Sequence, residues 1–355
     1  MAPQLHTLAE EFRWNADRVF PDASRLYQVL ARRVADDPAL LALAAHAQPH
    51  QPSVQLLFAA VHYLLLRDPD DPLSLFFADL ARKPNTQDDP FPIFRAYSLE
   101  HAAEIAALVG TRRVQTNEVG RCALFLPGFQ LIARQVEFQP CAQIEVGSSA
   151  GLNLNWEHYS YDYGDGLVWG DVAAPLRLRC ELRGAYKPPL TLLPDLRAAQ
   201  NGARPLRIGI DIQPNDVNDD DAMLWLRALV WPEQLERAER LARAIALARQ
   251  FPPQVVQGDA LELLPTVLAD IPRATPVVLF HSYVLNQFSA TARLRYQELL
   301  AAHSAGRLLF DLAIEPKEWP APLVLTRFHD GDRTTQELAV CDQHGRWLEW
   351  LESGA

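Results

Sequence analysis

The amino-acid sequence predicts an α/β protein in which an all-helical N-terminal part precedes a mainly parallel sheet. Up to about residue 137 the apolar residues recur at helical spacing with almost no strand pattern, whereas after residue 138 short apolar runs alternate with helical stretches. Near the C-terminus, period-two segments are separated by Asp330-Gly331-Asp332 and by His344-Gly345, which indicates antiparallel hairpin strands at the sheet edge.

The N-terminal part reads as a bundle of core-facing helices. Phe12, Ala16 and Val19 lie on one face at the i, i+3, i+4 spacing, and the later segments repeat this pattern. Proline-rich joints such as residues 36–38 and 84–92 separate the segments, because proline lacks the amide that a helix needs. We expect one helical domain over residues 1–137.

Five short apolar runs predict the strands of a second domain over residues 138–355, at 143–147, 206–212, 254–257, 276–281 and 307–314. Helical patterns lie between most of them, and this alternation is typical of a parallel sheet covered on both faces. Residues from about 158 to 204 interrupt it with many Tyr, Gly and Pro residues. We expect a β-rich insertion there.

The composition limits the function classes. The chain has 355 residues and a formal charge of −11, so it lacks the positive field that binds nucleic-acid phosphates. Its four cysteines form no Cys-x-x-Cys pair, and we predict no metal site. The N-terminus resembles no secretory signal, and the apolar run 56–66 is well short of the roughly 20 residues of a membrane helix. We expect a cytoplasmic protein that acts on a small molecule without nucleic acid or membrane; the oligomeric state stays open.

The strongest local signal is the segment from Glu145 to Asn153, a strand end followed by a small-residue turn. Gly147, Ser149 and Gly151 allow backbone to approach a ligand closely, and the amides of the predicted helix that follows attract polar groups. A nucleotide-like cofactor suits such a turn. Ser149 replaces the middle glycine of the dinucleotide fingerprint and no P-loop lysine follows, which weakens the NAD and ATP interpretations.

Acidic residues at the ends of three predicted strands match the order used by methyltransferases that depend on S-adenosylmethionine. Glu145 ends the first strand, and Asp211 ends the next, where a ribose-binding acid is expected. Asp259, with Ala260 beside it, follows the third strand, where the adenine is expected. Each also has a structural interpretation: Asp259 with Glu262 fits a helix capping box, and Asp211 can simply solvate a strand end.

A polar group follows the fourth strand, where the transferred methyl group is expected. It contains His281, Ser282, Tyr283 and Asn286. We expect His281 or Tyr283 to orient or deprotonate the methyl acceptor, and Ser282 and Asn286 to line the substrate side. His281 alone is also consistent with a hydrogen-bonded structural histidine.

A second polar group precedes the sheet domain, formed by Arg112, Arg113, Gln115 and Asn117. A guanidinium binds carboxylate or phosphate with two parallel hydrogen bonds, so this group is a candidate lid over a carboxylate of the cofactor or substrate. An ion pair with an acid such as Glu118 is the structural alternative.

The sequence resembles the uncharacterised family known as domain of unknown function 2332. The resemblance covers almost the whole chain and rests on distinctive motifs at residues 111–122, 144–154, 159–164, 228–232 and 280–282. It implies a Rossmann-like sheet related to methyltransferases and supports the fold more than any activity. One departure is the interval from Gly151 to Asp211, far longer than the usual ~20 residues between fingerprint and ribose acid, which the predicted insertion explains.

Three hypotheses follow. The first is an S-adenosylmethionine-dependent methyltransferase for a small molecule, with Glu145, the Gly147–Gly151 turn and Asn153 near the methionine portion. The second is a non-catalytic Rossmann-fold binding or interaction protein, which Ser149 favours because its side chain crowds the turn. The third, an NAD-linked oxidoreductase, depends on Asp211 alone.

Overall fold

The computed structural model describes residues 3–190, 206–316 and 319–351, and the chain divides into two compact units. The first comprises Met1–Thr116 and Asn218–Ala242, and the second comprises Asn117–Val217 and Arg243–Ala355. Residues 117–137, which the helical pattern assigned to the N-terminal domain, thus pack within the second unit. The predicted domain boundary near residue 137 stays a prediction.

The first unit is helical, in line with its apolar spacing. Its elements are α1 (Pro3–Arg18), α2 (Arg25–Val34), α3 (Pro38–Ala44), α4 (Ser53–Arg67), η1 (Pro72–Phe76), α5 (Phe91–Glu100), α6 (Ala102–Thr111) and α8 (Asp220–Ala228), and α9 (Leu235–Gln250) crosses the division between the units. Helix α3 shows how the proline joints act. Asp37 accepts the amides of Ala39 and Leu40, and Pro38 occupies the first turn, where a missing amide costs nothing.

Aromatic side chains fill the core of the first unit. The ring of Phe58 on α4 stacks on Tyr27 of α2 with 4.5 Å between ring centroids. The Phe58 ring also contacts Phe12, Phe20 and Phe94 in edge-on or tilted geometry, with centroid distances of 5.9 to 6.0 Å. These contacts bury α4 on nearly all sides, which accounts for its almost uniformly apolar sequence.

The second unit is built on a nine-stranded sheet of order β5-β12-β11-β10-β9-β8-β1-β6-β7. Eight of its strands are β1 (Ala142–Val146), β6 (Arg207–Asp211), β7 (Val255–Gln257), β8 (Val277–Ser282), β9 (Leu309–Ile314), β10 (Ala321–His329), β11 (Asp332–Cys341) and β12 (Trp347–Trp350). Strands β7, β6, β1, β8 and β9 pair in parallel, whereas β10, β11 and β12 follow as antiparallel neighbours. The predicted mainly parallel sheet with an antiparallel C-terminal edge is confirmed.

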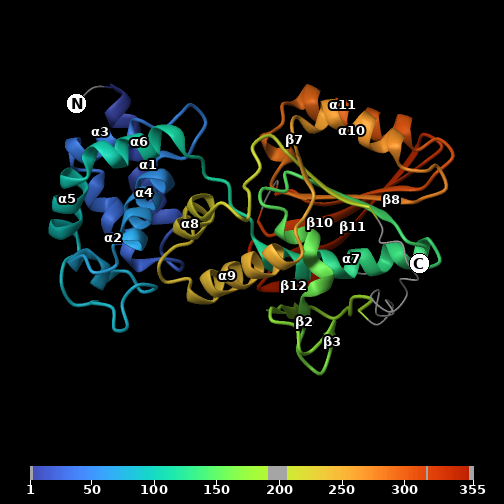
Figure 1. The fold of residues 1–355 in the computed structure, drawn as a ribbon, viewed down its shortest axis with the longest axis horizontal. Helices are drawn as coiled ribbons and strands as arrows, with labels where there is room; N and C mark the ends of the chain where they lie inside the picture. Colours follow the sequence, from blue (N-terminus) through green and yellow to red (C-terminus); the bar gives the residue numbers. More distant parts are fainter. Residues whose placement is uncertain (1–2, 191–205, 317–318, 352–355) are drawn as a thin grey trace. The chain divides into compact units, whose positions relative to one another are not determined.

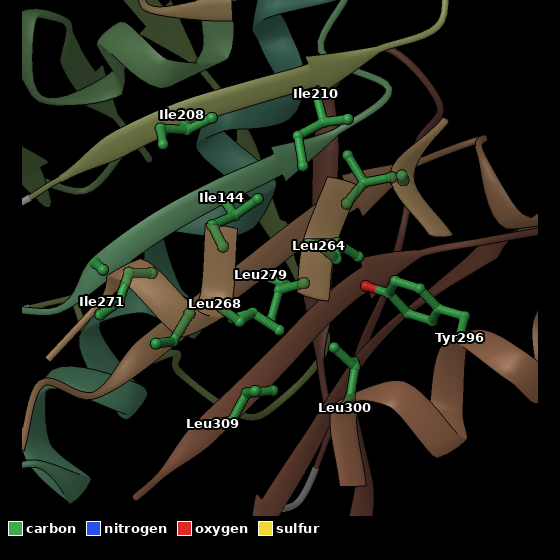
Figure 2. Close-up of a cluster of buried hydrophobic side chains, with 14 of the residues drawn as sticks. Ile144, Ile208, Ile210, Leu264, Leu268, Ile271, Leu279, Tyr296, Leu300 and Leu309 are labelled. Carbon is green, nitrogen blue, oxygen red and sulfur yellow. The ribbon is translucent and has the colours of Figure 1, made fainter. Parts of the chain in front are cut away.

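Helices α10 (Ala260–Asp270) and α11 (Ala290–His303) cover one face of this sheet. Figure 2 shows the buried layer between these helices and the sheet, in which Ile144 and Leu279 of the central strands face Leu264 of α10 and Leu300 of α11. Every side chain of β1 is buried, as a strand covered on both faces requires.

Helix α7 (Cys122–Gln135) lies on the opposite face (Figure 1). Phe280 follows Leu279 on β8 and therefore points away from α10 and α11. Its ring meets Phe125 and Phe129 of α7 edge-on, with centroids 5.5 and 5.3 Å away.

The expected insertion contains short strands. β2 (Ser160–Asp162), β3 (Val168–Trp169) and β4 (Arg177–Arg179) form a separate three-stranded sheet, and β5 (Glu181–Arg183) pairs with β12 of the large sheet. Three of its tyrosines, Tyr159, Tyr161 and Tyr163, are buried, and their hydroxyls donate to backbone carbonyls. The last part of the predicted insertion, residues 191–204, lies outside the described residues.

Within the described parts of the chain, no helix has both the length and the apolar character to cross a bilayer. The same residues contain no cluster of three or more His, Cys, Asp or Glu side chains arranged to hold a metal ion. All four cysteines are free thiols.

Candidate functional site

Three loops meet at one edge of the large sheet, because β6, β1 and β8 are parallel neighbours. They are residues 147–151 after β1, 212–217 after β6 and 283–289 after β8. The chain passes from β1 to β6 on one side, and the later strand β8 pairs with β1 on the other side. Ligands of open α/β sheets bind beyond the carboxyl ends of the strands at such a reversal of strand order. This edge is the candidate site.

Glu145 lies one residue before the end of β1 and is 4% exposed. Its Oε1 accepts a 2.9 Å hydrogen bond from Nδ2 of Asn153, whereas Oε2 is buried and has no hydrogen-bond partner among the described residues. Burial raises the pKa of Glu145 to about 8; the Asp211 carboxylate adds to this rise, and the Asn153 hydrogen bond and Arg121 oppose it. At pH 7 the site therefore contains a largely neutral, half-satisfied carboxyl group.

The turn after β1 is left-handed at three residues, with φ of 71° at Gly147, 53° at Ser149 and 69° at Gly151. Serine tolerates this region less readily than glycine, so Ser149 is a strained position. Its hydroxyl is directed to the loop after β6, where Oγ accepts a 3.1 Å hydrogen bond from Nδ2 of Asn215.

The element after the turn differs from the expected helix of residues 150–156. It is a seven-residue 3₁₀ helix, η3 (Leu152–His158). The hydroxyls of Tyr159 and Tyr161 donate to the carbonyls of Leu152 and Trp156, which an α-helix would use in its own turns. An extended ladder of amides at a helix N-terminus is thus not part of this site.

Val284, in the loop after β8, packs directly onto Gly147. A Cβ built on Gly147 would lie only 2.3 Å from Val284 Cγ2, so any larger residue at position 147 would displace that side chain. Close packing recurs beside it, where a Cβ on Gly209 would lie 2.4 Å from Ser148 Oγ. The Ser148 hydroxyl is fully buried and makes no hydrogen bond within the described chain.

Asp211 connects two of the three loops. Its Oδ2 accepts the amide of Ser149 and its Oδ1 accepts the amide of Gln213, both at 2.8 Å. Sequence reasoning placed Asp211 at this edge, and the structure places it there, 7% exposed. Its predicted role in holding a ribose stays a prediction.

Asp259 follows β7 and caps helix α10. Its carboxylate accepts the amide of Leu261 at 2.8 Å, and Ala260 is the first residue of the helix. The capping interpretation is confirmed, and an additional contact of Asp259 and Ala260 with adenine stays a prediction.

His281 is 1% exposed and lies between two carboxylates, those of Asp311 on β9 and of Glu315 directly after β9. Nδ1 is 2.8 Å from Glu315 Oε1, and Nε2 is 3.2 Å from Asp311 Oδ1. Burial disfavours the imidazolium, but the two carboxylates outweigh it and raise the pKa of His281 to about 10. A ring that is protonated at pH 7 and paired at both nitrogens cannot accept a proton from a substrate.

Glu315 also fixes the loop after β8. It accepts the backbone amides of Val284, Leu285 and Asn286 at 2.8 to 3.1 Å. Although burial acts in the opposite direction, these bonds and His281 hold the pKa of Glu315 below its usual value. The arrangement holds Val284 over Gly147, and the predicted substrate residue Asn286 contributes its backbone to it.

Tyr283 adopts a left-handed backbone with φ of 61°, which is unusual for an aromatic residue. The guanidinium of Arg121 lies 4.2 Å from its ring centroid and donates to Ser282 Oγ at 3.0 Å. Trp319 stacks on the ring with centroids 6.3 Å apart. The Tyr283 hydroxyl is buried, and no described residue bonds to it.

The predicted lid residues are divided between the two units. Asn117 belongs to the second unit, where its Oδ1 accepts the amide of Leu152. Arg112, Arg113 and Gln115 belong to the first unit, in which Arg112 pairs with Asp221 and the carbonyl of Arg113 accepts the indole N–H of Trp225. The predicted lid position of these three residues stays a prediction.

Sequence reasoning missed three residues that shape the site, namely Glu315, Val284 and Arg121. Glu315 carried a usable signal, because it immediately follows the predicted strand 307–314 just as Asp259 follows another. Val284 carried none, since one apolar residue in a loop has no pattern.

The architecture is that of an α/β protein with a large, mostly parallel sheet, antiparallel edge strands and a helical N-terminal region. Residues 9–350 match the family described as an uncharacterized protein conserved in bacteria, DUF2332. The chain belongs to this family, which confirms the resemblance drawn from its motifs. No curated protein and no solved structure matches it.

Proposed function

We propose that this chain is an S-adenosylmethionine-dependent methyltransferase for a small molecule, with a Rossmann-like sheet that binds the cofactor at the carboxyl edge of β1 and β6. The observation that carries the proposal is Glu145. A buried carboxyl oxygen without a hydrogen-bond partner is costly, and here it lies beside a left-handed turn where the strand order reverses. A ligand with hydrogen-bond donors would remove that cost.

The residues present fit this cofactor. Two buried polar atoms, Oε2 of Glu145 and Oγ of Ser148, have no hydrogen-bond partner among the described residues. Glu145, the turn and Asn153 would hold the methionine portion, Asp211 the ribose, and Asp259 with Ala260 the adenine. When bound, S-adenosylmethionine supplies an electrophilic methyl group.

The contribution of the chain itself is then orientation and exclusion of water, which can lower a barrier by ~7–11 kcal/mol when the reactants are well aligned. Tyr283 is the residue suited to orient the acceptor, because its hydroxyl has no partner among the described residues and its ring packs against Arg121 and Trp319. His281 takes no proton in this proposal. It acts through Glu315, which positions the loop of residues 283–286.

A second candidate, a non-catalytic Rossmann-fold binding or interaction protein, has specific support. Val284 covers the backbone of Gly147, and both oxygens of Asp211 already accept loop amides. A methyltransferase must move Val284 to bring a ligand against Gly147, whereas a binding module has no such need.

Calorimetry on the full chain separates these functions. We expect S-adenosylmethionine and S-adenosylhomocysteine to bind and NAD to give no heat. Glu145→Gln should weaken binding about tenfold or more, because a glutamine side chain cannot ionise to pair with a bound cation. The matched control is Glu298→Gln on the exposed side of α11, which should leave affinity unchanged. No heat with any of the three compounds would favour the module, and binding of NAD alone would favour an oxidoreductase.

A further inference from the structure

The core of the helical first unit contains a polar chain of residues that the proposed function does not use. His62 on α4 is fully buried, and its Nδ1 lies 3.1 Å from the carbonyl oxygen of Ala228, the last residue of α8. Its Nε2 lies 2.9 Å from Oδ2 of Asp79, in the loop after η1. All three residues belong to the first unit, and Ala228 begins the distinctive 228–232 motif of the sequence. His62 thus joins α4, α8 and the loop after η1 in the interior of this unit.

The hydrogen-bond geometry fixes the total charge of the His62–Asp79 pair. The carbonyl oxygen of Ala228 can only accept, so the proton of that bond lies on Nδ1. One further proton lies between Nε2 and Oδ2, either on the ring or on the carboxyl group, and the pair is neutral overall in both cases. Because both ring nitrogens are occupied, His62 is not available as a general base.

Two buried polar atoms at this place have no hydrogen-bond partner among the described residues, namely Oδ1 of Asp79 and the hydroxyl of Tyr27 on α2. The ring of Phe77 contacts both Tyr27 and His62, with centroids 6.4 and 5.3 Å away, so the phenol lies beside the pair. Burial, and then the carboxylates of Asp79 and Glu233, raise the pKa of Tyr27 well above its usual value. The phenol therefore keeps its proton at pH 7 and can donate it, whereas Asp79 Oδ1 can only accept.

The surroundings limit what can bond to both atoms. Tyr27 is 2% exposed, and its ring is enclosed by three phenylalanine rings with centroids 4.5 to 6.4 Å away, those of Phe20, Phe58 and Phe77. A ligand must therefore be small. It must accept from Tyr27 and donate to Asp79, and a neutral ligand is favoured because the pair already balances its own charge. Water meets all three requirements.

We propose that the helical unit has a binding site for one water molecule, which accepts a hydrogen bond from the Tyr27 hydroxyl and donates one to Oδ1 of Asp79. This water completes a polar chain that runs from Ala228 through His62 and Asp79 to Tyr27. The chain links α8, α4, the loop after η1 and α2 across a core that is otherwise aromatic. The inference goes beyond the proposed function and is independent of it, because all of its residues lie in the first unit.

A high-resolution crystal structure of the full chain tests the site directly. We expect electron density for a water oxygen about 2.6–3.2 Å from both the Tyr27 hydroxyl and Oδ1 of Asp79. The inference is overturned by a direct bond between the two side chains, by another part of the chain at this position, or by a lack of density there.

Tyr27→Phe provides a second test, in which the sign of the effect is decisive. If the hydroxyl is bonded to water, its removal should lower the midpoint of thermal unfolding by about 2–4 °C. If the hydroxyl has no partner at all, phenylalanine should leave the midpoint unchanged or raise it, because a buried unpaired donor is then removed. That second result would contradict the proposed water. Tyr97→Phe on α5 is the matched control, since its hydroxyl is not among the buried unpaired atoms, and it should shift the midpoint by less than about 1 °C.

Asp79→Ala tests whether the two atoms share one ligand. In this background the second partner of the water is gone, so Tyr27→Phe should no longer lower the midpoint. An equal decrease in both backgrounds would show that the bond of Tyr27 does not involve Asp79, which overturns the proposed bridge. If Asp79→Ala does not fold, the crystal structure and the sign of the Tyr27→Phe effect decide.

Discussion

Two glutamates near the ends of parallel strands in the same sheet, of which Glu145 is buried and Glu315 is partly buried, have opposite surroundings. Glu315, after β9, accepts His281 and three backbone amides, and these bonds lower its pKa. Glu145, near the end of β1, accepts a single bond and keeps a buried oxygen unpaired, and its pKa rises to about 8. A carboxylate with a full set of donors stabilises the fold, whereas one with a missing donor leaves room for a ligand to supply it.

The largest expected effect comes from removing the satisfied acid. Glu315→Ala should lower the free energy of unfolding by about 3–5 kcal/mol, because it leaves the His281 charge with one partner and three amides without an acceptor. Chemical denaturation of the full chain measures this. Glu298→Ala on exposed α11 is the control and should cost less than about 0.5 kcal/mol. A loss below about 1 kcal/mol for Glu315→Ala would contradict the contrast drawn between the two glutamates.

The next largest effect on stability comes from the contact between Val284, in the loop that Glu315 holds, and Gly147, in the turn after Glu145. Gly147→Ala should cost about 2–4 kcal/mol, part from the left-handed backbone and part from the clash with Val284. Gly164→Ala isolates the first part, since Gly164 has a φ of 79° and nothing within 4 Å of its missing Cβ. In the double variant Gly147→Ala/Val284→Ala the clash is relieved, so its loss in free energy of unfolding should shrink to about that of Gly164→Ala. No restoration would show that Val284 does not rest on Gly147.

A smaller effect follows from the pH dependence of the unsatisfied acid. The folded-state pKa of Glu145, about 8, lies above its ordinary 4.5, so its contribution to stability is fully present below pH 4.5 and is lost as pH rises to about 8. Relative to Glu145→Gln, the unaltered chain should therefore lose more than about 1 kcal/mol of stability between pH 5 and pH 8. Unfolding midpoints across this range measure it, and parallel curves for the two proteins would contradict a buried, neutral Glu145.

The smallest effect concerns a third acid, Asp259, whose carboxylate accepts the backbone amide of Leu261. Asp259→Ala should cost about 1 kcal/mol through loss of the α10 cap. Should the variant also bind S-adenosylmethionine about tenfold more weakly, Asp259 would have a ligand role beyond the cap. Unchanged affinity would leave the cap as its whole function.

The sequence predicted what depends on neighbouring residues. Alternating strand and helix patterns predicted the mainly parallel sheet, Asp259 with Glu262 identified a cap, and the position of Glu145 near a strand end placed it at the candidate edge. Contacts between distant residues were beyond it. Nothing near His281 shows that Asp311 and Glu315 would occupy both ring nitrogens, and this pairing is what makes His281 a poor base.

The ends of the large sheet have a consequence for how this protein meets other copies of itself. Its outermost strands as described, β5 and β7, are only three residues long, and β5 carries Glu181 and Arg183. A strand with so few free backbone groups, and with charges beside them, is a poor template for another chain to extend. Because the insertion places β5 beside β12, the backbone groups of β12 on that side are already paired, which disfavours edge-to-edge pairing with another chain.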